Sequence, residues 1–384
     1  MSKRIKVLQL QPDYNVKAYA FADLAEQIVM SLPRQRYEVV AAFLKGEPAA
    51  GQPVSRAERS VYFGFGDGQL KGLRLRALWR LYRFCQQEQF DVVICNRFKP
   101  VNMLLQLNRW LRIPVCIGIA HNLGDYDRRY RQRQIRRLAN RAWRFVGVSP
   151  AVRDELLSLR SGFTPDNTVA ITNAIDIEEA ESLLLSREEA RREFGLACDV
   201  RVVGSIGRQV RVKDYPRLIR AFAQVAQSYP GARLLLIGEG RETPALKAEV
   251  ARLGLEGKVL LPGALPNALR YVRAFDLWVM PSLAEGFPLA MMEAMCGRLP
   301  VIASDIPSMH ELVAGAGGCL VPPADEAQLA QALANHLALP AVELRARGLR
   351  AYDYLCTHHA IDDYRQAYRE LIERTLSANQ GDCV

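Results

Sequence analysis

Two glutamates eight positions apart, Glu285 and Glu293, are the acidic residues most clearly placed to do chemistry. They lie in segment 281–297, where Pro288 suits the first turn of a helix and Gly297 suits a left-handed C-cap. At 1.5 Å per residue they would be about 12 Å apart, which is too far for an acid/base pair on one bond. They could instead accept hydroxyl hydrogens from the two ends of an extended ligand. The helix N-terminus between them, with amides near Phe287 and Leu289, would bind phosphate.

A basic loop follows another strand-like run, 200–206. It contains Gly207, Arg208 and Lys213, and the two cations could together neutralise a diphosphate. Asp214 is expected to cap the next helix. A third turn, Ile237-Gly-Glu-Gly240, also ends a strand-like run, but its glycines could simply shape a turn.

These loops need strands to position them, and the sequence predicts two sets. Short apolar runs alternate with helix-period segments, which indicates an α/β fold with two parallel sheets. We expect strands at 5–10, 37–43, 60–65, 91–95, 114–120, 144–148 and 168–172, then at 200–206, 233–237, 258–261, 276–280, 300–303 and 318–321. Ligands bind outside the carboxyl ends of such strands. We expect one domain over 1–177 and a second over 178–360, with a C-terminal helix near 361–376 packing back on the first.

Charge is divided unequally between the halves. Residues 1–177 hold 28 Lys and Arg against 15 Asp and Glu, whereas residues 178–384 hold 23 against 26. A basic first half attracts an anionic partner. No apolar run approaches the ~18 residues of a membrane-spanning helix, and no signal peptide is evident, so we expect a cytoplasmic protein.

Two arginine-rich segments could carry that attraction. Segment 128–144 predicts an amphipathic helix whose outer stripe is basic. Segment 70–84 predicts a second helix, with Trp79 among its arginines. Both could equally be sheet-covering helices with a solvated face. The functional alternative is docking on an anionic membrane surface or a phosphorylated lipid, through Arg129, Arg133, Arg137, Arg141 and Trp79. No nucleic-acid-binding motif accompanies them.

Together, these motifs resemble the retaining GT-B glycosyltransferases of sequence family 4. The resemblance rests on the Glu-x7-Glu pair, the Gly-Arg…Lys-Asp loop, the Ile-Gly-Glu-Gly turn and the junction Asn173-Ala-Ile-Asp176, and it is strongest over 144–323. It implies two Rossmann-like domains facing each other across a cleft. The first loop, 11–18, departs from the family because it lacks the paired glycines that let the backbone approach the phosphate in many relatives. Asn15 and Lys17 would supply the ligand contacts of this loop instead.

The resemblance also implies roles for individual residues. Arg208 and Lys213, with Gly207, would bind the donor diphosphate, Glu293 the ribose and Glu285 the sugar, while Leu265 would lie beside the base. His121, in Ile119-Ala-His-Asn122, would face the reacting sugar. The catalytic set is therefore Glu285, His121, Arg208 and Lys213, and the remaining donor contacts are Phe287, Leu289 and Glu293.

The implied reaction is that of a hexosyltransferase, in which the sugar of a nucleotide-diphosphate sugar moves to an acceptor hydroxyl with retained configuration. We expect a UDP-sugar rather than a GDP-sugar, no cofactor and no metal. Asp125 and Asp127 have a metal-binding spacing, but they precede a helix, where acids favour the dipole. The acceptor would be an anionic glycolipid of lipopolysaccharide core or surface polysaccharide synthesis, reached from the inner face of the cytoplasmic membrane. Alternatives are another GT-B enzyme, such as a nucleotide-sugar epimerase or glycan phosphorylase, and a non-catalytic nucleotide-sugar-binding or scaffold protein.

Overall fold

A computed structural model describes residues 3–21 and 23–380, which divide into two compact units. Residues 3–173 and 361–380 form the N-terminal unit, and Ala174–Ala360 form the C-terminal unit. Segment 174–177, which we expected in the first domain, belongs to the second. The reason is local, because Ile175 pairs with Ala360 and its N–H donates to the His359 carbonyl at 3.2 Å.

The N-terminal unit has a parallel sheet of order β3-β2-β1-β4-β5-β6-β7. All five β4 residues and all six β5 residues are buried, as strands covered on both faces require. The strands are β1 Ile5–Gln11, β2 Tyr37–Phe43, β3 Arg59–Tyr62, β4 Val92–Asn96, β5 Val115–Ala120, β6 Trp143–Gly147 and β7 Thr168–Ala170. The helices are α1 Leu24–Met30, η1 Asp67–Leu70, α2 Leu75–Glu88, α3 Phe98–Leu111, α4 Arg129–Leu138, α5 Pro150–Ser158 and α14 Ile361–Gln380.

The C-terminal unit has a parallel sheet of order β10-β9-β8-β11-β12-β13. Its strands are β8 Arg201–Ile206, β9 Ala232–Ile237, β10 Val259–Gly263, β11 Leu277–Met280, β12 Val301–Ser304 and β13 Cys319–Val321. Its helices are α6 Ile177–Ser182, α7 Arg187–Arg192, η2 Arg211–Lys213, α8 Tyr215–Val225, α9 Thr243–Arg252, η3 Ala268–Ala274, α10 Leu289–Cys296, α11 Pro307–Gly315, α12 Glu326–Leu337 and α13 Ala341–His358. Leu218, Ile219, Phe222 and Val225 of α8 are buried in its core. The predicted two-sheet α/β fold is therefore confirmed.

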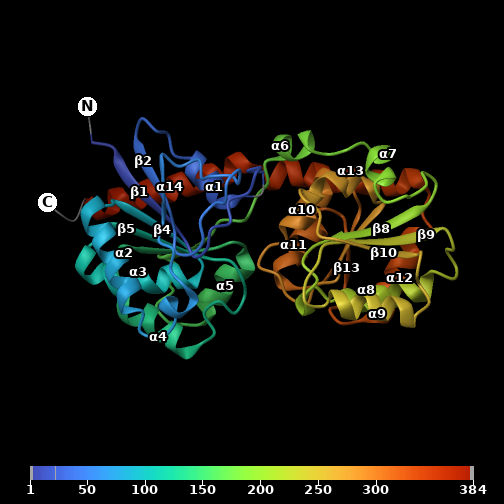
Figure 1. Cartoon of the computed structure of the whole chain (residues 1–384), viewed down its shortest axis with the longest axis horizontal. Coiled ribbons are helices and arrows are strands. Elements are labelled where there is room, and N and C mark those ends of the chain that lie inside the picture. Colours follow the sequence, from blue (N-terminus) through green and yellow to red (C-terminus); the bar gives the residue numbers. More distant parts are fainter. Residues whose placement is uncertain (1–2, 22, 381–384) are drawn as a thin grey trace. The chain divides into compact units, whose positions relative to one another are not determined.

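Helix α14 completes the N-terminal unit. Figure 1 shows it in red among the blue elements of that unit. Tyr364 Oη donates to the Leu24 carbonyl at 3.3 Å, and Arg365 Nε donates to Gln27 Oε1 at 2.8 Å. Ile372 is fully buried. The chain therefore leaves this unit once and returns to it for its last described helix.

The arginine-rich helix is shorter than we expected. Helix α4 ends at Leu138 instead of continuing to residue 144. The Asn140 side chain accepts from the Ala142 N–H at 3.0 Å, a local turn that redirects the chain into β6. Arg141 and Arg144 consequently lie outside the helix, and Arg144 bonds to the Arg141 and Trp143 carbonyls.

Candidate active site

The candidate donor site is built where the strand order of the C-terminal sheet reverses. Strands β8 and β11 are neighbours there, although strands β9 and β10 lie between them in chain order. Ligands bind outside the carboxyl ends of strands at such a switch point. The loop after β8 and the loop after β11 are joined by a hydrogen bond of 2.8 Å from the Leu283 N–H to the Val212 carbonyl. The two segments that the sequence singled out thus lie side by side.

Lys213 and Glu285 meet in this place. Lys213 Nζ lies 2.6 Å from Glu285 Oε1, and the two side chains are 16% and 14% exposed. An ammonium has three N–H donors, so this bond leaves two that can face a phosphate. Arg208, from the same loop, is exposed, and its side chain has no hydrogen-bond or ion-pair partner among residues 3–21 and 23–380. The pair is therefore preorganised, and Arg208 is available to an anion.

Tyr215 packs beneath this pair and explains Gly207. A Cβ at Gly207 would lie 2.7 Å from Tyr215 Oη and 3.7 Å from Lys213 Cε, so only glycine fits. Tyr215 Oη lies 3.3 Å from Ser205 Oγ. Burial raises the pKa of Tyr215 to about 12. The Ser205 hydrogen bond lowers this pKa and the Glu285 charge raises it, but both effects are smaller than that of burial. The phenol therefore stays protonated near neutral pH.

The glycines of the Ile237-Gly-Glu-Gly240 turn allow close backbone approach. Gly238 has φ +137°, and a Cβ there would lie 2.0 Å from the Gly207 carbonyl oxygen. A Cβ at Gly240 would lie 2.3 Å from the Gln209 carbonyl oxygen. The Gly238 N–H donates to the Gly263 carbonyl at 2.8 Å, which brings the loop containing Leu265 to the same edge. Leu265 is half-buried on that edge.

Helix α10 differs in detail from the prediction. It begins at Leu289 with Pro288 as its N-cap residue, and the Leu289 N–H donates to the Phe287 carbonyl at 3.1 Å. That amide is occupied here and does not point to a ligand. The predicted left-handed C-cap at Gly297 is wrong, because Gly297 has φ −74° and the next residue, Arg298, has φ +59°. Gly297 is required for space, since a Cβ would lie 2.7 Å from Val272 Cγ1.

The other two side chains of this segment have separate surroundings. Phe287 packs on His359, with ring centroids 5.4 Å apart. Glu293 is half-buried on α10. Burial of the Cys296 thiol is the main reason that its pKa is raised, and the nearby negative charge of Glu293 raises it further. Glu285 and Glu293 therefore occupy different environments, and only Glu285 is bonded to Lys213.

A buried arginine, which no sequence motif indicated, holds the loops in place. Asp214 does stand at the start of α8, but its side chain makes no cap and its φ is +48°. Its carboxylate accepts instead from Arg217 Nε at 2.7 Å. Arg217, 2% exposed, also donates to the Pro281 carbonyl at 2.6 Å and to Ser304 Oγ at 3.1 Å. It therefore ties α8 to the ends of β11 and β12.

Other polar residues near these loops were missed because their types carry no motif. Gln209 Oε1 accepts from Thr243 Oγ1 at 2.6 Å, and the Gly240 N–H donates to the same hydroxyl at 2.9 Å. Ser282 Oγ is buried without a hydrogen-bond partner in the described chain. Only the tertiary fold brings these side chains to the β8 and β11 loops.

His121 lies at the carboxyl end of β5 in the N-terminal unit. Its Nε2 lies 3.2 Å from Asn96 Oδ1, at the end of the adjacent strand β4. Burial, and then the nearby Arg97 charge, lower the pKa of His121 to about 4. The imidazole is thus neutral near pH 7 and can donate one hydrogen bond and accept another.

Asp125 shapes the His121 loop. Its Oδ2 accepts from the His121 N–H at 3.0 Å and from the Asn122 N–H at 3.2 Å. Asp127 lies near Gly124, whose φ is +79°. Among the described residues, no group of three or more His, Cys, Asp or Glu could hold a metal ion.

The first loop is fixed by neighbouring chain rather than by glycine. The Tyr14 N–H donates to the Lys45 carbonyl at 2.7 Å, and Tyr14 Oη donates to the Pro53 carbonyl at 2.6 Å. Asn15 and Lys17 are exposed on this loop. Their side chains are therefore at the surface.

Basic and aromatic side chains share one layer of the N-terminal unit. Helix α3 packs against both α2 and α4. Trp79 on α2 is 61% exposed and Trp110 on α3 is 65% exposed. Arg129, Arg133 and Arg137 on α4 are exposed, and so is Arg141 beyond its end. No helix in the described part of the chain is long and apolar enough to cross a membrane.

Comparison with known proteins places this geometry in a family. Residues 200–338 match the family model described as glycosyl transferases group 1, and residues 24–179 match glycosyltransferase family 4. The lipopolysaccharide core biosynthesis mannosyltransferase LpcC of Rhizobium leguminosarum is 30% identical over 188 residues, 47% of this chain and 53% of that protein. The 2-deoxystreptamine glucosyltransferase of Streptomyces kanamyceticus is 29% identical over 197 residues, 50% of this chain and 51% of that protein. The chain spans about half the length of these curated relatives.

Solved structures match over nearly the whole chain. Anabaena HepE in complex with UDP has a TM-score of 0.79 at 22% identity, covering 96% of this chain and 100% of that one. A sucrose-phosphate synthase from Thermosynechococcus elongatus has a TM-score of 0.81 at 20% identity, covering 98% and 100%. The family 4 match covers most of the N-terminal unit and ends six residues into the C-terminal unit, which contains the whole group 1 match. The strand orders are those of Rossmann-like sheets. The chain therefore belongs to the group 1 glycosyltransferases of GT-B fold.

Proposed function

We propose that the protein transfers a sugar from a nucleotide-diphosphate sugar to an acceptor hydroxyl, with retention of anomeric configuration. The observation that carries this proposal is the Lys213–Glu285 pair at the switch point between β8 and β11. A fixed cation and a fixed carboxylate in one place suit a donor that joins a diphosphate to a polyhydroxyl ring. Family membership and the UDP complex of the HepE neighbour support the same donor class.

In this proposal the C-terminal unit binds the donor. Lys213 and Arg208 bind the diphosphate, and Gly207 leaves room for it. Glu285 accepts hydrogen bonds from the sugar, Glu293 binds the ribose, and Leu265 lies beside the base. Phe287 and Leu289 line the α10 end, where Leu289 contributes its side chain because its amide is occupied. His121 of the N-terminal unit faces the reacting sugar as a neutral hydrogen-bonding group.

The reaction breaks the bond from the anomeric carbon to the phosphate oxygen and forms a bond to the acceptor oxygen on the same face. The acceptor proton passes to the departing phosphate oxygen. Negative charge grows on the diphosphate as the bond breaks, so Lys213 and Arg208 stabilise the transition state more than the ground state. No metal ion enters this mechanism.

We further propose a UDP-sugar as the donor and an anionic glycolipid or polysaccharide precursor as the acceptor. The LpcC relative acts in lipopolysaccharide core biosynthesis, and a Bacillus subtilis relative is a putative teichuronic acid biosynthesis glycosyltransferase, 30% identical over 193 residues. The exposed arginines of α4 and Trp79 of α2 suit an anionic membrane surface at which such an acceptor is held. The protein would then work at the inner face of the cytoplasmic membrane.

The test measures nucleoside diphosphate release from UDP-glucose and GDP-mannose panels with glycolipid acceptors. Lys213→Ala and Glu285→Ala should each lower kcat by about 10²–10³-fold, as loss of one charge-stabilising contact does. Arg211→Ala is the matched control, because Arg211 is exposed on the same loop. Unchanged turnover in both site variants would overturn the assignment. Formation of an epimerised sugar when no acceptor is present would favour an epimerase. Binding of the donor without any turnover would favour a non-catalytic protein.

Retention is tested separately by NMR of the product. The coupling constant of the transferred sugar's anomeric proton should report the same configuration as in the donor. An inverted product would exclude front-side transfer while leaving the donor site intact.

A further inference from the structure

A cavity of about 520 Å³ lies at the other end of the C-terminal sheet from the donor loops. Its wall includes Arg201 at the start of β8, Pro300 just before β12, and Leu344 and Arg345 on α13. The donor loop follows the opposite end of β8, and six residues of strand span roughly 17–20 Å. The cavity is therefore separate from the Lys213–Glu285 pair.

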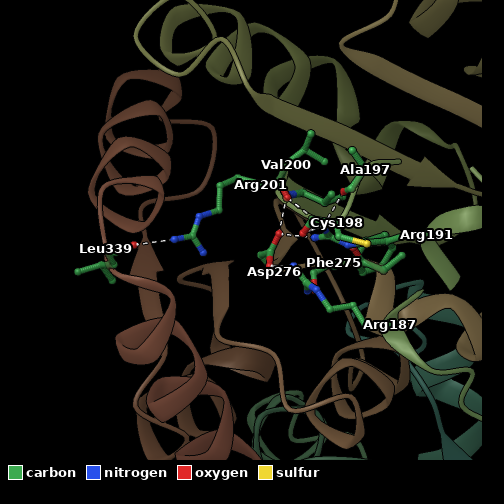
Figure 2. Close-up of polar contacts among 11 residues, drawn as sticks. Arg187, Arg191, Ala197, Cys198, Val200, Arg201, Phe275, Asp276 and Leu339 are labelled. Carbon is green, nitrogen blue, oxygen red and sulfur yellow. Dashed lines mark hydrogen bonds and ion pairs between the residues drawn. The ribbon is translucent and has the colours of Figure 1, made fainter. Parts of the chain in front are cut away.

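Arginines outnumber acids in this wall. Five arginines line it, Arg187, Arg201, Arg273, Arg298 and Arg345, against the two aspartates Asp199 and Asp276. Asp276 is fully engaged, because its oxygens bind Arg187 at 2.6 Å and the buried Arg191 at 2.7 Å. Figure 2 shows both guanidinium groups directed at this one carboxylate. Two cations on one anion leave the cluster positive.

The remaining arginines have spare donors. The Arg201 side chain makes one hydrogen bond within the described chain, to the Leu339 carbonyl at 3.1 Å (Figure 2). In the described ranges 3–21 and 23–380, the side chains of Arg273 and Arg345 have no hydrogen-bond or ion-pair partner, although Arg273 is half-buried. Arg298 differs, because it is paired with Glu181 at 2.7 Å. A partly desolvated guanidinium without a partner is costly unless a ligand supplies one.

The rest of the wall is apolar. Phe275, Leu299 and Leu344 line it and are at most 5% exposed. A volume of this size is typical of small-molecule sites, which combine apolar walls with a few placed polar groups. The ligand must therefore carry both negative charge and a carbon skeleton.

We propose that this cavity binds a small organic phosphate. Arg201, Arg273 and Arg345 hold its phosphate oxygens, and Phe275, Leu299 and Leu344 contact its carbon skeleton. A phosphate suits this arginine-lined wall better than a carboxylate, because it offers the guanidinium donors more acceptor oxygens and more negative charge.

The test is calorimetric titration of the full chain with phenyl phosphate. Binding should weaken at least tenfold in Arg273→Gln/Arg345→Gln. It should be unchanged in Arg350→Gln, an exposed α13 arginine outside the cavity wall, and in Arg208→Gln/Lys213→Gln at the donor loop. Circular dichroism and thermal unfolding should be the same in every variant. Binding lost only in the donor-loop variant, or equal in all variants, would overturn the proposal.

Two further probes define the source of the phosphate. Inorganic phosphate should bind more weakly than phenyl phosphate, because it lacks the ring, and equal affinity would overturn the apolar half of the proposal. Sedimentation with phosphatidic acid vesicles that is lost in Arg273→Gln/Arg345→Gln would assign the phosphate to a lipid headgroup. Soluble binding without such sedimentation would assign it to a free metabolite.

Discussion

A methyl group has no room at Gly238. A Cβ would lie 2.0 Å from the Gly207 carbonyl oxygen, and φ is +137°. Gly238→Ala should therefore lower the free energy of unfolding by roughly 3 kcal/mol and weaken donor binding, since the Gly207 loop must shift. Urea unfolding and UDP titration measure the two effects.

Gly231→Ala is the matched control for this prediction, because open space surrounds a Cβ at Gly231. It should change neither quantity by more than about 1 kcal/mol. Equal stability of the two variants would contradict the close approach of the β8 and β9 loops.

His121 should make the protein less stable as acidity rises. Its pKa is about 4 in the folded chain, below the ordinary value of 6.5, so the unfolded chain binds more protons between these values. The stability contributed by the neutral imidazole is complete above pH 6.5 and is lost as the pH falls towards 4. For this partly exposed group the loss should be roughly 2 kcal/mol.

The measurement compares urea unfolding of the wild type and His121→Asn from pH 7 to pH 4.5. Asparagine does not titrate, so the variant should lose less stability over this range. Parallel pH curves would show that His121 is not held neutral by its surroundings.

At the scale of elements, Arg217 determines how α8 meets the sheet. It is 2% exposed and bonds to Asp214, the Pro281 carbonyl and Ser304. Arg217→Met should lower the free energy of unfolding by about 3 kcal/mol or more, because buried partners lose their hydrogen bonds. Donor affinity should fall too, since Pro281 begins the loop that carries Glu285. Chemical denaturation and nucleotide titration give both values.

Arg220→Met on the same helix is the control. Arg220 is 38% exposed and pairs with Glu326 at the surface, where such pairs contribute about 0–1 kcal/mol. A similar loss of unfolding free energy in both variants would contradict the prediction that the buried contacts of Arg217 stabilise the protein more than a surface ion pair does.

The α4 region should control attraction to anionic lipid. Changing Arg133, Arg137 and Arg141 to Glu reverses three exposed charges and should sharply reduce sedimentation with phosphatidylglycerol vesicles. The wild-type binding should also weaken as salt rises, because salt screens exposed charge. Reversal of Arg192, Arg241 and Arg252, exposed in the C-terminal unit, is the charge-matched control. Binding indifferent to both the α4 charges and salt would contradict the docking proposal.

Sequence pattern predicted the elements better than their ends. Each of the thirteen expected strands exists, because apolar runs and turn residues are local signals. The end of α4 was wrong because Asn140 bonds to the backbone of residue 142, which competes with the helical period. The Gly297 cap was wrong because its glycine serves a contact with Val272, distant in sequence. Arg217 and Tyr215 were missed for the same reason, since only folding brings their partners together.

At the scale of the whole molecule, α14 makes the last described residues part of the first unit. Ile372 is fully buried there, and Tyr37 Oη donates to Glu373 Oε1 at 3.0 Å. Ile372→Ala should therefore destabilise the N-terminal unit by about 2–5 kcal/mol, as large-to-small changes in a core do. Val342→Ala on α13, where the side chain is 68% exposed, should have little effect.

The two units can be distinguished by ligand. UDP at 100 times its dissociation constant should stabilise the unit that binds it by about 2.7 kcal/mol. In calorimetry of Ile372→Ala, UDP should raise the transition of the C-terminal unit and leave the lowered N-terminal transition where it is. A single unfolding transition, whose temperature is lowered by the substitution and raised by UDP, would show that the units unfold together. The two connections between the units, which enter and leave the C-terminal unit beside the paired residues Ile175 and Ala360, would then couple their stabilities.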